Sequence, residues 1–384
     1  MTKANTQTAP VLQASRRRDA ARQLLSPGQI RESLGLAPQL WLRSSVLVGA
    51  QAALAAGIAM TLACLSPWPH LLGFVALGTL IALFGRFAPA GQRGPILFKA
   101  ALCQTAAVLI MSLMAYAGLP PLVQLTALAL LSGVYLLIAT TGGYGPPGAL
   151  IFVFAAGAAM GGHDLTGVDV LERTLATFAA SVLSLGICAI SEHLRPQATP
   201  ERPFPADPLR PQAHRLIASG RVALGTGLAA WLAILAGAAH PAWAMLGAMA
   251  VLQGTHLHIT MNRAVQRMLG TVAGAALAWA ILSGAPPIWA LILLLMLMQC
   301  LAELVIGANY ALAQIFVTPM ALLMTHLAGH GMAGPDMASE RVLDTIIGAG
   351  IGIALALVFS TLDDRRHLAQ HHEARLQRLP QPRR

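Results

Sequence analysis

Long apolar stretches separated by short polar connections run through most of this chain. Twelve such segments can be drawn, several of them shorter than the roughly 20 residues that a helix needs to cross a bilayer. The first six are 44–65, 71–85, 96–117, 122–141, 149–162 and 175–191. The second six are 222–239, 242–257, 268–283, 288–306, 311–329 and 342–360. The pattern predicts an all-α polytopic membrane protein with about 12 transmembrane helices.

Two landmarks occur once in each half of the chain. The dipeptide Glu-Arg begins one apolar stretch at position 172 and another at position 340, and Ile-Phe-Val occurs at 151–153 and again at 315–317. Internal repeats of apolar segments are common in membrane transporters. We therefore expect two parallel six-helix repeats, related by a pseudo-two-fold axis along the membrane normal.

The repeats divide the chain into five parts. These are an N-terminal tail, a first transmembrane repeat, a Pro-rich linker, a second repeat and a basic C-terminal tail, at 1–43, 44–191, 192–221, 222–360 and 361–384. The prolines disfavour a continuous helix in the linker, so we expect it to be extended.

Composition supports a membrane environment. Hydrophobic residues make up 56% of the chain and charged residues only 10%, whereas soluble domains have roughly 25% charged residues. With a cytoplasmic N-terminus, twelve crossings place all but two of the 25 Lys and Arg residues inside, the exceptions being Arg173 and Arg341. This positive-inside bias predicts that both termini are cytoplasmic. It explains the net charge of +10 through contacts with anionic lipid headgroups rather than nucleic acid.

Motifs of enzyme chemistry are absent from the sequence. No Walker lysine motif, nucleotide-binding fingerprint, HExxH or nucleophile elbow occurs in a plausible context. The four cysteines have no paired spacing, and His256 and His258 face apart on a regular helix, so we expect no disulfide and no metal site. The sequence predicts no enzyme and no cofactor, and transport would need an ion gradient.

One motif stands at the start of the ninth segment. Arg263, Arg267 and Thr271 share one face of a helix there, and Gly270 and Gly274 form a surface that lets a neighbouring helix approach closely. This Arg-x-x-Gly-Thr-x-x-Gly pattern follows a basic start and an apolar segment that opens with a Pro and a Trp. In these features the second half of the chain resembles the fusaric acid resistance protein-like (FUSC) family of aromatic acid exporters.

The resemblance implies a bacterial inner-membrane exporter of aromatic or other organic acids. It also implies that the proton gradient drives export, often together with a periplasmic adaptor protein. Larger family members carry a cytoplasmic domain after each set of six helices, where this chain has only a short linker and a short tail. The adaptor and further copies of the chain remain open as protein partners.

Candidate substrate-binding residues follow from the motif and from the repeat. The guanidinium groups of Arg263 and Arg267 either attract a carboxylate at the cytoplasmic side or extend to lipid headgroups and fix the topology. Thr271 lines the same face or serves helix packing. Asn309 and Tyr310 begin the eleventh segment, where the first repeat has a Gly-rich stretch. Broken backbone at matching positions points to a substrate site, although both stretches could simply be loops.

Carboxylates inside the apolar segments are candidates for proton coupling. Glu303 lies in the tenth segment, and desolvation of such a carboxylate favours its protonated form. Asp344 lies close after Glu340 and Arg341, and all three side chains can meet on one helix face. The structural alternatives are an ion pair or hydrogen bond at Glu303. For Asp344 they are favourable placement at a helix N-terminus, with Arg341 neutralising one of the acids.

These observations predict a secondary active exporter of small organic anions, first of all aromatic carboxylates, driven by the proton gradient. A passive organic-anion channel with a continuous polar pore is one alternative. A membrane assembly or interaction protein is another, and in that case the intramembrane acids should be dispensable. A twelve-helix major-facilitator-type fold is the alternative architecture.

Overall fold

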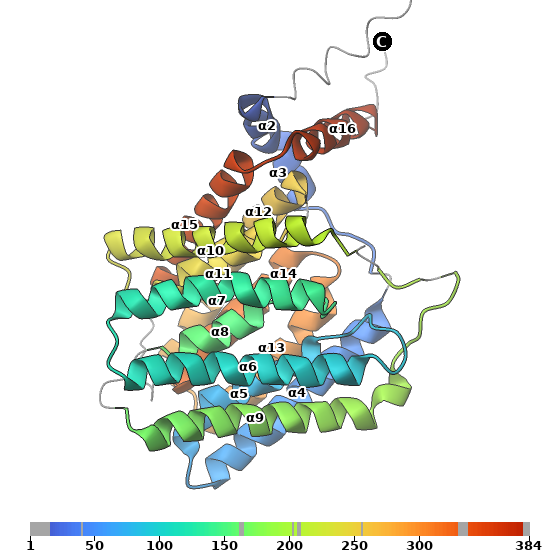
Figure 1. Cartoon of the computed structure of the whole chain (residues 1–384). Coiled ribbons are helices and arrows are strands. Elements are labelled where there is room, and N and C mark those ends of the chain that lie inside the picture. Colours follow the sequence, from blue (N-terminus) through green and yellow to red (C-terminus); the bar gives the residue numbers. More distant parts are fainter. Residues whose placement is uncertain are drawn as a thin grey trace, which may run out of the picture.

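The computed structural model describes residues 16–39, 41–160, 165–201, 203–205, 209–254, 256–328 and 337–378. Fifteen α-helices and three short 3-10 helices make up most of these ranges (Figure 1). The ends of the fifth and eleventh predicted segments, at 161–162 and 329, lie outside the described residues, as do 1–15 and 379–384 of the predicted tails.

Nine helices of the described ranges are long and apolar enough to cross a membrane. They are α4 (Leu42–Leu65), α6 (Arg93–Tyr116), α7 (Pro121–Thr141), α9 (Gly167–Ile190), α10 (Gln212–Leu235), α12 (Leu257–Ser283), α13 (Ile288–Ile306), α14 (Tyr310–Ala328) and α15 (Met337–Val358). The protein is therefore an all-α multi-pass membrane protein, as the sequence predicted.

Three predicted segments are helical but too short to cross alone. They are α5 (Leu72–Thr79) between the 3-10 helices η1 (Pro69–Leu71) and η2 (Leu80–Leu83), α8 (Leu150–Ala158), and α11 (Ala242–Leu252). The prediction of twelve full crossings is therefore not confirmed. Apolar composition indicates that a segment is removed from water. A segment buried among other helices therefore has the same kind of composition as one that faces lipid.

The predicted tails and linker contain further helices. These are α2 (Arg17–Leu24), α3 (Pro27–Ser33), η3 (Glu192–Leu194) and α16 (Leu362–Arg378). In addition, α10 begins at Gln212, within the stretch that we expected to be extended. The last proline of the linker, Pro211, is the N-cap of α10, a position where a proline does not interrupt the helix.

Helices of the two halves pack in matching pairs. α4 packs against α13, and α10 packs against α7, so the first helix of each half contacts the fourth helix of the other. Within the halves, α6 packs on α9 as α12 packs on α15, and α5 packs on α9 as α11 packs on α15. Figure 1 shows α7 and α10 side by side. The same pairs thus recur in both halves, while two parallel six-helix repeats in the membrane stay a prediction.

The short helices α5 and α11 lie in the interior. Every residue of α5 is buried, as is every residue of α11 from Trp243 onwards. Glycines make this packing close: a Cβ at Gly78 would lie 2.5 Å from the Thr177 carbonyl oxygen of α9. A Cβ at Gly348 of α15 would lie 2.1 Å from the Ala244 carbonyl oxygen of α11. Both short helices are thus held backbone to backbone against a long one.

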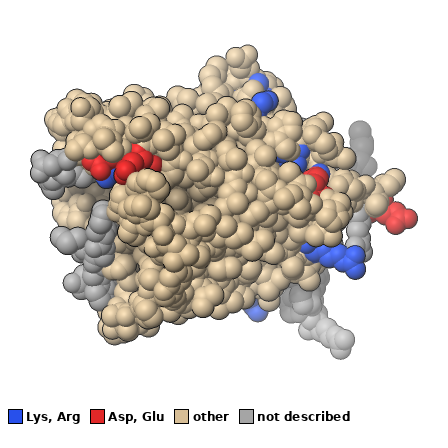
Figure 2. All heavy atoms as spheres, turned by 90° about the horizontal axis from the view of Figure 1, so that it is seen from below, with Lys and Arg blue, Asp and Glu red and all other residues tan. Residues whose placement is uncertain are grey.

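Charged side chains lie mostly at the ends of the bundle. Figure 2 shows a broad band without charged side chains between a mostly acidic cluster at one end and basic and acidic groups towards the other. Such a band is what a membrane protein presents to the hydrocarbon core of a bilayer.

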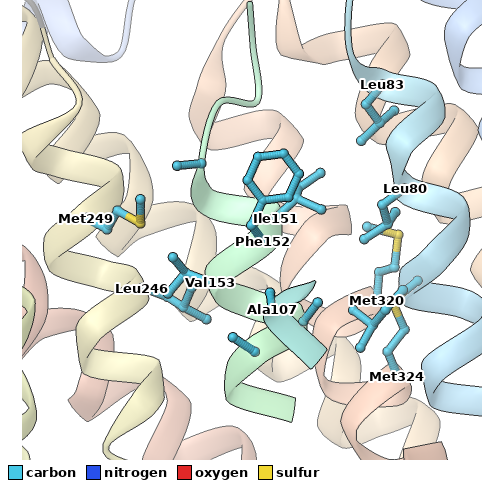
Figure 3. Close-up of a cluster of buried hydrophobic side chains, with 14 of the residues drawn as sticks. Leu80, Leu83, Ala107, Ile151, Phe152, Val153, Leu246, Met249, Met320 and Met324 are labelled. Carbon is cyan, nitrogen blue, oxygen red and sulfur yellow. The ribbon is translucent and has the colours of Figure 1, made fainter. Parts of the chain in front are cut away.

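Apolar side chains fill the contact between the two halves. α8 of the first half packs on α11 of the second, and α14 of the second half packs on α5 of the first. Figure 3 shows the side chains that meet there, among them Leu80, Leu83, Ile151, Phe152, Val153, Leu246, Met249, Met320 and Met324. At this level the interface between the halves is apolar.

Candidate functional site

Two buried arginines of the second half form the centre of the candidate site. Arg267 of α12 is 2% exposed and Arg341 of α15 is 4% exposed. The Arg267 Nη1 donates a hydrogen bond to the Tyr310 hydroxyl at 3.0 Å. The Arg341 guanidinium carbon lies 5.3 Å from the centre of the Trp243 ring. Arg341 is also within electrostatic range of Arg267 and of Asp344, so two like charges share one apolar interior.

Many polar atoms of this cluster have no hydrogen-bond partner within the described residues. They are the Arg267 Nε, the Arg341 Nε and Nη1, both carboxylate oxygens of Asp344, and the hydroxyls of Thr271 and Thr318. Asp344 is only 1% exposed. Buried polar groups are nearly always satisfied in native proteins. Unused guanidinium donors in the interior are what an anionic ligand would accept from.

The glycines of the motif bring α12 against α14. A Cβ at Gly270 would lie 2.4 Å from the Ala311 carbonyl oxygen, and one at Gly274 would lie 2.8 Å from the Thr318 Cβ. The helix-packing interpretation is thereby confirmed for both glycines. The close approach places Thr271, which lies between them in sequence, in the buried cluster.

The first half has no matching cluster. Ala176 stands where the repeat places Asp344, and aromatic rings fill the region around the start of α8. The Phe84 and Phe152 rings stack at 5.1 Å, and Tyr144 meets Phe152 edge to face at 6.3 Å. The basic-aromatic contact is kept, since Arg173 lies 5.1 Å from the Phe74 ring. Two other buried arginines, Arg93 and Arg195, lie 3.6 and 2.6 Å from the Glu192 carboxylate, whereas Arg267 and Arg341 have no such ion pair within the described residues.

A histidine–glutamate pair begins the last long helix of each half. The His240 Nδ1 and the Glu340 Oε2 are 2.8 Å apart, and the His240 amide donates to the Glu340 Oε1 at 2.7 Å. In the first half, the His70 Nε2 lies 2.8 Å from the Glu172 Oε2. Glu340 pairs with His240, while Asp344 stays within electrostatic range of both Glu340 and Arg341. The three residues thus lie near one another, as expected, but Glu340 has its ion pair with His240. Matching positions of the two histidines in the repeat could have revealed these pairs.

Arg263 and Arg267 have separate roles. The Arg263 Nη1 donates to the Ala250 carbonyl at 3.4 Å, and in the first half the Arg93 Nη2 donates to the Ala82 carbonyl at 2.9 Å. Each arginine satisfies carbonyl groups at the C-terminal end of a short helix, which have no partner within it. The proposal that both motif arginines extend to lipid headgroups fails for Arg267, which is buried in the bundle.

Glu303 lies outside the cluster. Its carboxylate accepts a hydrogen bond from the Arg86 guanidinium, and both side chains are buried. Of the two interpretations of Glu303, the structure supports the ion pair. The sequence did not show which residue pairs with Glu303, because Arg86 lies 217 residues away, in the connection after η2.

Asn309 and Tyr310 face different neighbours. The Asn309 Nδ2 donates to the Gly35 carbonyl at 2.9 Å, and its Oδ1 accepts from the Ala311 amide at 2.7 Å. Asn309 therefore fixes the N-terminal segment and begins α14. Of this predicted pair, only Tyr310 joins the arginine cluster.

The family match lies in the half that carries the cluster. Residues 228–355 match the family described as fusaric acid resistance protein-like. Over 122 residues the chain is 40% identical to the uncharacterized membrane protein YvaC of Bacillus subtilis (strain 168), covering 32% of this chain and 19% of YvaC. Over 120 residues it is 31% identical to the inner membrane protein YccS of Escherichia coli (strain K12), covering 31% of this chain and 16% of YccS.

The chain thus spans less than a fifth of the length of either relative. No solved structure matches it. The matched residues include Trp243, Arg267, Tyr310, Arg341 and Asp344. The resemblance that the Arg-x-x-Gly-Thr-x-x-Gly motif predicted is confirmed, and the segment that holds the buried cluster is a fusaric acid resistance protein-like segment.

Proposed function

We propose that this protein is a secondary active exporter of small organic anions, in particular aromatic carboxylates, driven by the proton gradient. The observation that carries the proposal is the buried pair Arg267 and Arg341, whose guanidinium donors are only partly used. A guanidinium binds a carboxylate through two parallel hydrogen bonds. The rings of Trp243 and Tyr310 lie against these arginines and offer apolar faces to an aromatic substrate.

Charge balance favours an anion over a neutral ligand. A buried charge is tolerated when it is paired and hydrogen-bonded, and it is costly otherwise. Two guanidinium groups share the cluster with a single carboxylate, that of Asp344, which makes no hydrogen bond within the described residues. A bound carboxylate would supply the missing negative charge and accept the unused donors.

Proton coupling is proposed for the acids beside this pair. Asp344 is within electrostatic range of Arg341, Glu340 and His240. Its protonation state therefore sets the net charge that an anion meets. The electrical part of the gradient also favours the exit of an anion, by about 2.3 kcal/mol per charge for each 100 mV.

The membrane arrangement is part of the same proposal. The chain would lie in a bacterial inner membrane, as the name of the inner membrane protein YccS suggests, with both termini in the cytoplasm. Basic residues of α2 and of the C-terminal tail would contact anionic headgroups. A periplasmic adaptor protein and further copies of the chain are proposed as partners on the family resemblance alone.

Flux of a panel of aromatic acids into inside-out vesicles tests the proposal. We expect uptake that an imposed proton gradient stimulates. Saturable flux that ignores the gradient would indicate a channel instead, and no flux would indicate an assembly role.

Conservative variants test the arginine pair in the same vesicles. Arg267→Lys keeps the charge but loses the second parallel hydrogen bond, so we expect uptake to fall about 10-fold, the equivalent of roughly 1.4 kcal/mol. Arg263→Lys, on the same helix, is the matched control and should keep the wild-type rate at equal protein level. Wild-type flux in Arg267→Lys would overturn the role of this guanidinium.

Asp344→Asn tests the coupling. The amide keeps the shape of the side chain but cannot exchange a proton at physiological pH. We expect residual uptake that the imposed gradient no longer stimulates, and stimulation at the wild-type level would remove Asp344 from the proposal.

A further inference from the structure

Three helices outside the long bundle gather at one end of the second half. They are α2, α3 and α16, from opposite ends of the chain, and they lie beside one another in Figure 1. α3 packs on α12, and α16 packs on both α2 and α12. These helices thus form one small cap.

α3 is fixed next to the buried arginine cluster. The Gln266 Nε2 donates to the Ser33 carbonyl at 2.7 Å, and the Asn309 Nδ2 donates to the Gly35 carbonyl at 2.9 Å. Gln266 and Asn309 directly precede the two residues of the cluster that hydrogen-bond each other, Arg267 and Tyr310. α3 therefore lies across the ends of α12 and α14 that lead to the cluster.

α16 holds α3 in this position. The Glu32 carboxylate of α3 lies 2.9 Å from the His371 Nε2 and 3.5 Å from the Arg375 Nη1. The contact is close, because a Cβ at Gly28 would lie 2.8 Å from the Arg375 Nη2. Displacement of α16 would remove these partners of α3.

Histidine rings of α16 meet histidine rings at the start of α12, where His256 is the N-cap. The His258 and His371 rings stack at 4.2 Å, and the His256 and His367 rings lie 4.9 Å apart. A fifth histidine, His372, accepts a hydrogen bond at its Nδ1 from the Arg375 Nη2 at 2.9 Å. We call these five residues the histidine clamp.

The charges around the clamp are unbalanced. Near His258 lie Glu32 of α3 and the other histidines, and near His372 lie Arg375 and Glu373 of α16. In α2, Ala20 and Leu24 are buried, while the charged side chains are exposed or half exposed. Around His258 and His372, two carboxylates and one arginine therefore leave less negative charge than protonated histidines would add as positive charge.

We propose that the histidine clamp makes docking of the cap pH-dependent: near neutral pH it holds α16, and through it α3, over this end of the second half, and on acidification it releases them. The Glu32 carboxylate, 2.9 Å from the His371 Nε2, offsets one positive charge in the clamp. A second positive charge in the stacked His258–His371 pair places two like charges in contact, and further charges add to the repulsion. Release would regulate the access of an anion to the arginine cluster, and this purpose rests on the proposed function.

The direction of the pH effect follows from proton binding. Burial, the neighbouring Arg375 and His371 together lower the pKa of His372 in the docked state. Released α16 therefore takes up a proton at His372 more readily than docked α16 does. Docking is strongest above the ordinary histidine pKa of about 6.5 and weakens as the pH falls through it.

A distance measurement on the full chain in lipid nanodiscs tests the clamp. Spin labels at Ala374→Cys of α16 and Leu216→Cys of α10, both exposed positions, would be placed in a background with the four native cysteines replaced by alanine. We expect one narrow distance distribution at about pH 8 and a longer, broader one at about pH 5.5. Identical distributions at the two pH values would overturn the proposal.

Variants separate the clamp from a general loss of structure. The triple variant His258→Gln, His371→Gln and His372→Gln should keep the narrow distribution at both pH values, and His214→Gln, an exposed histidine of α10, should respond like the parent. Glu32→Gln should shift release to higher pH, because the offsetting carboxylate is gone. A pH response that survives in the triple variant would contradict the clamp.

The measurement needs no substrate, so its outcome is independent of the transport result. A normal pH response without anion flux would refute the proposed function and leave the clamp in place. Gradient-driven flux with a pH-insensitive distance would do the reverse.

Discussion

Gly348→Ala is a direct test of how the second half positions its arginine cluster. The added Cβ would lie 2.1 Å from the Ala244 carbonyl oxygen and 2.8 Å from the Ala248 amide nitrogen. Ordinary contacts begin at 3.4 Å, so the closer one falls short by about 1.3 Å. Both neighbours are backbone atoms of α11, so no rotation of a side chain relieves the clash. α15 must move away from α11.

The size of the effect follows from two opposing terms. Overpacking of a well-packed interior costs about 1–3 kcal/mol, and a clash with backbone falls at the upper end of that range. Alanine in place of glycine in a helix raises the free energy of unfolding by at most about 1 kcal/mol. We expect Gly348→Ala to lower the free energy of unfolding by about 2 kcal/mol. The displacement also moves Arg341 from the Trp243 ring, so export should fall as well.

Gly350→Ala is the matched control on the same helix. Its Cβ would meet nothing within 4 Å, so we expect no loss and a gain of up to about 1 kcal/mol. Unfolding in mixed micelles with increasing sodium dodecyl sulfate, followed by tryptophan fluorescence, measures both variants. Equal midpoints for the two variants would refute the reasoning about the α11–α15 contact.

Three further predictions concern individual contacts. Glu303→Gln leaves the buried Arg86 guanidinium without its charge partner and should lower the free energy of unfolding by about 3–5 kcal/mol. The double variant Arg86→Met and Glu303→Leu should recover most of that loss in the same titration. Arg263→Ala leaves the Ala250 carbonyl without its donor and should cost about 1 kcal/mol of stability, while flux per molecule in vesicles stays within about twofold. Trp243→Leu removes the ring beside Arg341, a contact of up to about 2 kcal/mol, and should raise the KM for an aromatic acid; an unchanged KM would remove Trp243 from the substrate site.

Local features of the fold were readable in the sequence. Helix periodicity and apolar length predicted each of the twelve segments as a helix, because both depend only on neighbours along the chain. Gly270 and Gly274 predicted a close helix contact for the same reason: their spacing puts them on one helix face. The short length of α5, α8 and α11 was missed, because apolar composition alone does not distinguish lipid from protein surroundings.

The candidate site was only partly predictable. The motif, the repeat and the rarity of acids in apolar segments singled out five residues that the structure brings to one buried region. They are Arg267, Thr271, Tyr310, Arg341 and Asp344. Arg263, Asn309 and Glu303 were named by the same reasoning and have other partners. Nothing in the sequence distinguishes the two groups, since partners such as Arg86 and Glu303 are brought together only when distant helices pack.

By itself, the sequence determined that the protein lies in a membrane and which segments are helical. It also showed the repeat landmarks and the family that the second half resembles. Each of these follows from composition or from spacing over a few residues, where the geometry of a helix is fixed in advance. The tertiary structure decided which arginine has a partner, which carboxylate is left without a donor, and which histidines of α12 and α16 meet. Charges act over a few ångströms, and those distances exist only after helices far apart in sequence have packed against one another.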